Sequence, residues 1–149
     1  MAMLLCDTNV WLALALSKHG HHDSARGWLD TIDERAVIHF CRATQQSFLR
    51  LLTNRTVLGA YGNAPLTNDE AWSVYAALLA DDRITMAGQE PSGLEAAWRS
   101  FAVRPSASPK VWMDAYLAAF ASTGGYELVT TDTDFRQYQG VALRLLGHS

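Results

Sequence analysis

The sequence predicts an α/β domain in which a central, mostly parallel sheet is covered by helices on both faces. Short apolar runs, typical of buried strands, alternate along the chain with longer stretches that carry apolar residues at helical spacing. The 149 residues are 49% hydrophobic and 18% charged, which is enough to form one sizeable core. No internal repeat or low-complexity tract divides the sequence, so we expect a single domain over residues 1–149.

The first half of the chain predicts two strands, each followed by helices. The apolar run Met3–Cys6 ends at a polar triplet, which favours a buried strand followed directly by a helix start. The next residues, Val10–Leu16, are continuously apolar, so this first helix should be largely buried. A helix over His21–Ile32, a strand over Ala36–Cys41 and a helix over Thr44–Leu52 follow. Residues 53–65, with several Gly and Asn and one Pro, are expected to form a loop or a short helical turn.

The second half predicts three further strands. Thr67 and Glu70 form a capping box, which starts a helix that ends near Ala80. The remaining elements are expected, in order, to be a strand over Ile84–Met86, a helix over Ser92–Phe101, a loop over Arg104–Pro109, a helix over Val111–Ser122 that stops at Gly124–Gly125, a strand over Glu127–Thr131, a turn over Asp132–Phe135 and a strand over Val141–Leu146. Helices between successive strands favour parallel pairing, and the ligands of such sheets gather beyond the carboxyl ends of the strands.

Composition excludes several classes of protein. The formal net charge of −3, from 12 basic and 15 acidic residues, excludes a protein that binds nucleic acid through bulk positive charge, although not a nucleic-acid enzyme. The chain reaches Asp7 without a basic amino-terminal region and has no apolar run of the roughly 20 residues that span a bilayer. We therefore expect no signal peptide, no membrane partner and a cytoplasmic location. Cys6 and Cys41 lie in apolar strands and are expected to be reduced thiols of the core.

Four acidic residues stand where a parallel sheet gathers its ligands. Asp7 directly follows the first strand, and Asp132 follows the strand over Glu127–Thr131, with Asp134 close behind it. Asp114 lies in a helix between apolar neighbours, where a charged residue is seldom buried without a partner. If the two strands are adjacent, the three acids that follow them meet at one edge of the sheet, within reach of the start of the Asp114 helix.

Converging carboxylates repel one another and raise one another's pKa, and a hard divalent cation resolves that conflict. A set of oxygen ligands without His or Cys favours Mg²⁺ or Mn²⁺ over zinc. Such a cation can make a hydroxide nucleophile and stabilise the charge of a phosphoryl transition state. The acids therefore predict metal-assisted hydrolysis of a phosphodiester.

Ordinary structural roles are open to the same residues. Asp7, or its neighbours Thr8 and Asn9, could cap the helix that follows. Thr8 and Asn9 could equally position a water molecule or a ligand. Asp132 and Asp134 could shape a turn through bonds to their own backbone. Each of these acids taken alone favours the structural role, whereas Asp114, with apolar neighbours on both sides, is harder to explain in that way.

Four segments together carry a resemblance to a known family. They are Asp7–Leu12 (DTNVWL), Thr44–Asn54 (TQQSFLRLLTN), Asp114–Ala121 (DAYLAAFA) and Leu128–Phe135 (LVTTDTDF), and in order and spacing they resemble a PIN domain, more closely a VapC-type toxin of a bacterial toxin–antitoxin pair. The resemblance implies a three-layer αβα fold and a Mg²⁺- or Mn²⁺-dependent endoribonuclease that acts on tRNA or rRNA. It also implies a homodimer and inhibition by a VapB-type antitoxin. It assigns metal-site roles to Asp7, Asp114 and Asp132, and with less support to Asp134.

The chain departs from the family at one position. Most PIN nucleases carry an acid, usually Glu, in the helix after the second strand, where this chain has Gln45 within the stretch 44–47. A Gln oxygen can ligate a cation or hold a water but adds no charge, so we expect weaker metal binding or an Asp-only ligand set. The missing acid keeps open a non-catalytic PIN-like module that binds RNA or protein. A different α/β phosphohydrolase ranks well behind, because it would need an acid in place of Asn9 and a Lys near a late strand end.

A few other residues invite a functional role. Arg50 could pair with an acid of the site or with phosphate, or it could form a structural salt bridge. The three His residues at positions 19, 21 and 22 are expected to be surface groups without a functional role. The helices around Trp11 and Trp28 would suit a homodimer or an antitoxin groove.

Overall fold

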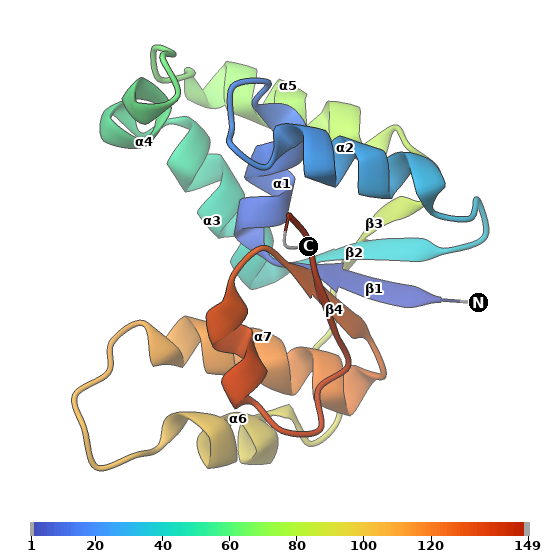
Figure 1. Ribbon diagram of the computed structural model, residues 1–149, viewed down its shortest axis with the longest axis vertical. Helices are drawn as coiled ribbons and strands as arrows, with labels where there is room; N and C mark the ends of the chain where they lie inside the picture. Colours follow the sequence, from blue (N-terminus) through green and yellow to red (C-terminus); the bar gives the residue numbers. More distant parts are fainter. Residues whose placement is uncertain (1, 148–149) are drawn as a thin grey trace.

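The computed structural model describes residues 2–147, and its five strands form one sheet (Figure 1). The strand order is β3-β2-β1-β4-β5, and every pair is parallel. The strands are β1 (Met3–Cys6), β2 (Val37–Cys41), β3 (Ile84–Ala87), β4 (Glu127–Thr130) and β5 (Leu143–Leu145). The predicted parallel sheet is therefore confirmed.

The register makes β1 the centre of the sheet. Leu5 of β1 pairs with His39 of β2 on one side and with Leu128 of β4 on the other. Beyond the last strand pair, the amide of Asp7 donates to the Val129 carbonyl at 2.9 Å. The carboxyl ends of β1 and β4 therefore lie side by side, which is the condition on which the convergence of the predicted acids depends.

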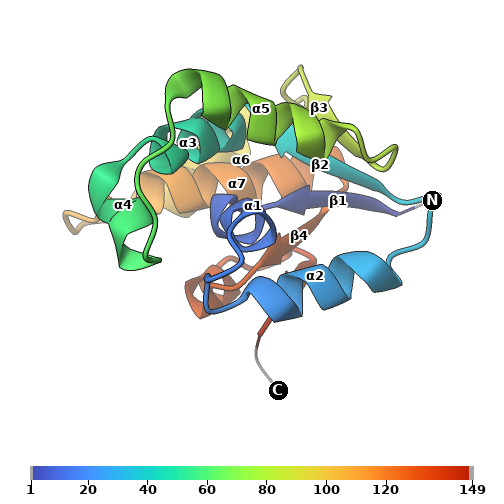
Figure 2. The ribbon, with the colours of Figure 1, turned by 90° about the horizontal axis from the view of Figure 1, so that it is seen from above.

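Helices cover both faces of the sheet. In Figure 1, α6 and α7 lie below the strands, and α1, α2, α3 and α5 lie above them; Figure 2 gives the view from above. The helices are α1 (Thr8–Ala15), α2 (His22–Thr31), α3 (Arg42–Leu52), α4 (Arg55–Ala60), α5 (Asn68–Leu79), α6 (Leu94–Ala102) and α7 (Val111–Gly124), with a short 3-10 helix η1 (Thr133–Gln137). This arrangement confirms the three-layer αβα architecture.

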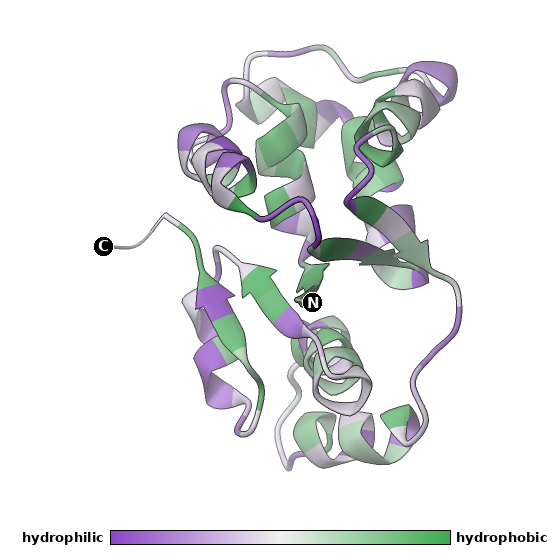
Figure 3. Ribbon diagram, turned by 90° about the vertical axis from the view of Figure 1, so that its right-hand side faces the viewer, coloured by the Kyte–Doolittle hydropathy of each residue, from purple (hydrophilic) through white to green (hydrophobic). Residues whose placement is uncertain are grey.

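Each face of the sheet has its own core, because successive side chains of a strand point to opposite faces. Leu4 packs into the cluster under α1, α3 and α5, where the rings of Trp11 and Phe40 stack with centroids 3.8 Å apart. Leu5 belongs to the other cluster, which includes Phe120 of α7. In Figure 3 the apolar residues concentrate on the strands and the helices around them. The continuously apolar strands predicted from the sequence fit a sheet that is buried on both faces.

Most helix boundaries differ from the sequence expectations by one or two residues, and two differences have a clear local cause. The helix expected from Thr44 begins two residues earlier, because Thr44 Oγ1 accepts from the Cys41 amide at 3.0 Å and caps the first turn. The stretch expected as a loop or short turn contains α4, whose Asn54 side chain accepts from the Val57 amide. The stop after α7 is confirmed, since Gly125 takes the left-handed conformation with φ 74°.

Both cysteines are buried and free, as predicted. Across residues 2–147, the structure contains no helix with the length and apolar character needed to cross a bilayer.

Candidate functional site

The candidate site lies at the carboxyl edge of β1 and β4. Asp7 follows β1 and stands at the amino-terminal cap position of α1, yet its side chain makes no capping hydrogen bond to that helix. Its Oδ2 instead accepts from Thr130 Oγ1, at the end of β4, at 2.9 Å. The capping role that the sequence left open for Asp7 is therefore not the one adopted.

Thr130 links two of the acids across the neighbouring strands. This fully buried hydroxyl donates to Asp7 and accepts from the Asp132 amide at 3.0 Å. The turn role left open for Asp132 does hold for one of its oxygens, because Oδ1 accepts from the Asp134 amide at 2.9 Å. Thr130 is not among the residues singled out from the sequence. The feature that could have identified it is the pair of hydroxyl residues, Thr130 and Thr131, between an apolar strand and Asp132.

Asp114 reaches the same edge from the first turn of α7. Burial, and next the charge of Asp7, raise the pKa of Asp114 to about 6. The pKa of Asp7 is likewise raised by burial, and the charge of Asp132 adds to the rise although hydrogen bonds from Thr130 and the Thr8 amide oppose it. Burial also raises the pKa of Asp132, but hydrogen bonds from Lys110 and the Asp134 amide outweigh it and leave the pKa below its usual value.

Lys110 supplies the positive charge among these acids. Its Nζ lies 2.8 Å from Asp132 Oδ2, 3.1 Å from Asp134 Oδ2 and 3.9 Å from Asp114 Oδ2. These carboxylates hold the pKa of Lys110 above its ordinary value. No lysine is expected from the sequence near the end of a late strand, and for Lys110 this expectation is wrong. The loop before α7 folds back and brings Lys110 to the end of β4. The spacing of four residues between Lys110 and Asp114 is the feature of the sequence that could have placed Lys110 near an acid of the site.

The donor set fits a hard divalent cation. All candidate ligands are carboxylate oxygens. Burial raises the pKa of both Asp7 and Asp114, and the charge of Asp7 raises the pKa of Asp114 further. Among the residues that the structure describes, no three carboxylate, imidazole or thiol groups already converge at a spacing that would hold a metal ion. The ammonium of Lys110 stands among the acids instead.

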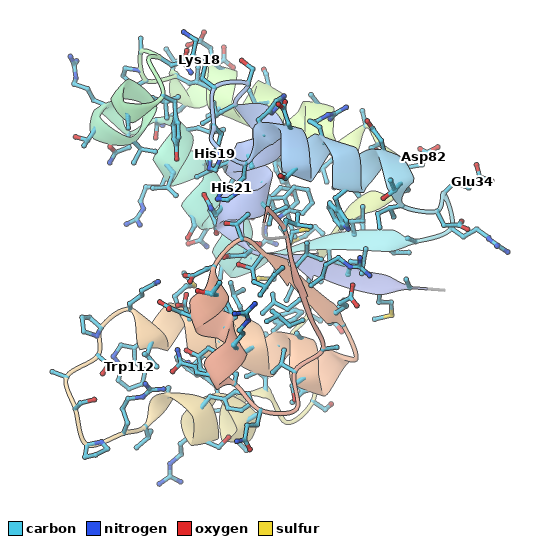
Figure 4. All side chains as sticks on the ribbon, in the orientation of Figure 1. Lys18, His19, His21, Glu34, Asp82 and Trp112 are labelled. Atoms are coloured by element: carbon cyan, nitrogen blue, oxygen red, sulfur yellow. The ribbon has the colours of Figure 1, made fainter. Side chains whose placement is uncertain are left out.

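A buried polar network flanks the acids. Asn9 donates through Nδ2 to Thr131 Oγ1, and its Oδ1 lies 2.9 Å from His19 Nε2. His19 Nδ1 accepts from the His21 amide at 3.0 Å, so Nε2 carries the proton and donates to Asn9. His19 is buried and stacks on Tyr61, which corrects the expectation that all three histidines are surface groups. The labelled His19 and His21 lie in the loop between α1 and α2 in Figure 4.

The other predicted supporting residues lie apart from the acids. Gln45 is buried in α3, where its Oε1 accepts from Arg42 at 2.7 Å and its side chain bonds to Tyr75. Arg50 is exposed and lines a groove between α3 and α5 together with Trp72. Thr8 contributes its amide to Asp7. The structure therefore brings Asp7, Asp114, Asp132, Asp134, Thr8 and Asn9 together, and shows no contact from Gln45 or Arg50 to the acids.

The tryptophans expected at a partner surface are core residues. Trp11 and Trp28 are 0% and 7% exposed, so neither indole is available to a partner. Trp112 and Trp72 are 55% and 54% exposed instead. Trp112, Met113 and their neighbours Ala43, Trp98 and Tyr116 form an open apolar patch, which we call the aromatic patch; Figure 4 labels Trp112 beside the lower helices.

A hollow of about 560 Å³ opens at the other end of the sheet, between the amino ends of β1, β4 and β5. Its charged groups are Glu127 and Arg144, which pair with each other at 2.8 Å. No group of acids faces this hollow, so we place the candidate site at the carboxyl edge.

Comparisons with known proteins agree on the family. The family model described as PIN domain matches residues 4–141. Ribonuclease VapC41 of Mycobacterium tuberculosis is 76% identical over 144 residues, which cover 97% of this chain and 99% of the relative. Ribonuclease VapC29 of the same species is 27% identical over 92% of this chain and 91% of its own length.

Solved structures show the same fold. VapBC2 from Rickettsia felis, bound to a DNA fragment from its promoter, matches with a TM-score of 0.66 and 12% identity over 97% of this chain and 98% of that one. Mycobacterium tuberculosis VapC20, described as a toxin that cleaves the Sarcin-Ricin loop, matches with a TM-score of 0.64 and 18% identity over 93% of this chain and 98% of that one. At these identities the likeness concerns the fold alone.

Proposed function

This chain belongs to the PIN-domain family and to its VapC branch, and from that premise we propose that it is an endoribonuclease toxin of a VapBC-type pair. We propose that it hydrolyses RNA phosphodiester bonds with a bound Mg²⁺ or Mn²⁺ ion. The observation that carries the proposal is the crowding of Asp7, Asp114 and Asp132 at the carboxyl edge of the sheet, where burial and mutual repulsion raise the pKa of Asp7 and Asp114.

Asp7, Asp114 and Asp132 would hold the ion, with Asp134 at the exposed rim. When bound, such an ion would activate a water molecule and neutralise the charge that develops on the phosphate. The protein itself positions the ligands. The Thr130 hydroxyl bonds to both the Asp7 side chain and the Asp132 backbone and so fixes the distance between these two residues. The apolar turns of α7 keep Asp114 away from bulk water.

Asn9 is the polar side chain best placed to orient a water or a phosphate oxygen. It lies in the first turn of α1, two residues after Asp7, and its amide is held at both ends by His19 and Thr131. A side chain held in this way loses little conformational freedom when it binds a substrate.

A second candidate function is a non-catalytic module that binds RNA or protein. It is favoured by Gln45, whose oxygen is engaged with Arg42 and adds no charge to the site. Incubation of the purified chain with total RNA and Mg²⁺ separates the two. A nuclease gives cleavage that requires the cation and disappears in Asp114→Ala, whereas cleavage that persists in that variant, or none by the unchanged chain, contradicts the nuclease proposal.

We propose tRNA or rRNA as the substrate class, a VapB-like antitoxin as a partner and a homodimer as the assembly. Structures among the fold neighbours are described as VapBC complexes, which supports the antitoxin. The aromatic patch offers the apolar surface that a second copy would cover, because Trp112 and Met113 keep 55% and 42% of their surface exposed. Sequencing of cleaved RNA ends after brief expression would identify the substrate.

A further inference from the structure

Lys110 is the group of the candidate site that the proposed reaction does not yet use. It stands immediately before α7, and its ammonium contacts Asp132 and Asp134 directly and Asp114 more distantly. One ammonium among four carboxylates leaves the site acidic, so a divalent cation is still attracted to it.

The hydrogen bonds of Asp132 engage both of its carboxylate oxygens. Oδ1 is occupied by the Asp134 amide, which shapes the turn into η1. Oδ2 is occupied by the ammonium of Lys110 at 2.8 Å. A divalent ion that binds through Oδ2 shares that oxygen with the ammonium, and one that binds through the remaining lone pair of Oδ1 still lies on the same carboxylate. In either case the two cations repel each other across Asp132.

We infer that Lys110 is a built-in counter-ion that competes with the divalent cation for Asp132 and so sets the cation concentration at which the site fills. The inference rests on the proposed function, because it concerns the metal site of that function. It adds Lys110 to the residues of that site.

The geometry favours release of Lys110 over a permanent bond. Its side chain remains 63% exposed, and among the described residues its ion pairs are all with these acids. Exposed ion pairs are weak, so a doubly charged ion can displace the ammonium into solvent without disturbing the core. Without the cation, the same ammonium partly offsets the cost that burial imposes on the ionised forms of Asp114 and Asp7.

The test is Mn²⁺ binding by isothermal titration calorimetry, without RNA, on the metal-free chain and three variants. Lys110→Met removes the competitor and is expected to bind Mn²⁺ about tenfold more tightly. Lys110→Arg keeps a cation at this position and should bind no more tightly than the unchanged chain. Lys18→Met is the matched control, because it removes the chain's other lysine, which lies in the loop after α1, far from α7 (Figure 4).

Each outcome decides the inference. Tighter binding confined to Lys110→Met supports it. Equal or weaker binding by Lys110→Met, or an equal gain in Lys18→Met, overturns it and leaves the proposed function standing. Absence of Mn²⁺ binding in every chain overturns the metal site and the inference together. Circular dichroism monitors folding, and Lys110→Gln replaces the Met variant if that chain unfolds without metal.

Discussion

Asp114→Asn should stabilise the metal-free protein while it removes the proposed activity. The pKa of Asp114 rises from 3.8 to about 6 on folding, because burial and the charge of Asp7 disfavour its ionised form. A shift of about two units corresponds to about 3 kcal/mol at most. The site opens to solvent through the exposed Lys110, so screening reduces the expected gain to about 1 kcal/mol, or about 3 °C in Tm.

The sign of the pH dependence follows from the direction of the shift. An acid whose pKa is raised by folding destabilises the folded state above that pKa and has no such effect below its unfolded value. The Asp114 carboxyl should therefore cost the unchanged protein stability as the pH rises from about 4 to about 7, and the Asn variant should lack that contribution. The advantage of the variant should be full at pH 7.5 and shrink steadily toward pH 4.

Urea unfolding in EDTA at pH 7.5, 5.5 and 4.5 measures this advantage. Asp132→Asn is the control, because folding lowers the pKa of Asp132 and its removal should destabilise the protein at pH 7.5. The reasoning is refuted if Asp114→Asn is no more stable than the unchanged chain at pH 7.5, or if its advantage does not vary with pH.

The remaining predictions concern activity, metal binding and assembly. Asp7→Asn should abolish Mg²⁺-dependent RNA cleavage with the circular dichroism spectrum intact, and unchanged cleavage would exclude Asp7 from the reaction. His19→Phe, which keeps the ring on Tyr61 but loses the bond to Asn9, should lower kcat about tenfold in steady-state cleavage, and a normal kcat would make His19 purely structural. Gln45→Glu should leave Mn²⁺ binding in calorimetry unchanged within about twofold, because the side chain lies apart from the acids and Arg42 would pair with the new carboxylate, and a clear gain in affinity would place Gln45 in the metal site after all. Trp112→Asp should turn a dimer into a monomer by light scattering, and a dimer of unchanged mass would show that the aromatic patch is not the contact.

Much of the fold follows from local rules that operate within a few residues. The capping box of Thr67 and Glu70 forms as the sequence predicts, with both hydrogen bonds present. The polar stop after Met3–Cys6 places Asp7 at a strand end for the same local reason. Strand and helix order could be predicted because hydrophobic period and capping depend only on near neighbours.

The candidate site was only partly predictable. The acids at the strand ends could be named, because a turn or helix start after an apolar run is visible in the sequence. The burial of His19 could not, because it depends on Tyr61 of another loop and on Asn9 of another element. The exposure of Trp112 and the burial of Trp11 could not either, since both lie among apolar residues and only packing distinguishes them.

The sequence by itself determined the alternation of strands and helices, the family, and the four acids that end or interrupt apolar elements. The tertiary structure decided which of those groups meet. Pairing of β1 with β4 brings Thr130 to Asp7 across 123 residues, and the return of the loop before α7 brings Lys110 to Asp132 across 22. Such contacts depend on strand order and core packing over the whole chain, and no local pattern of residues encodes them.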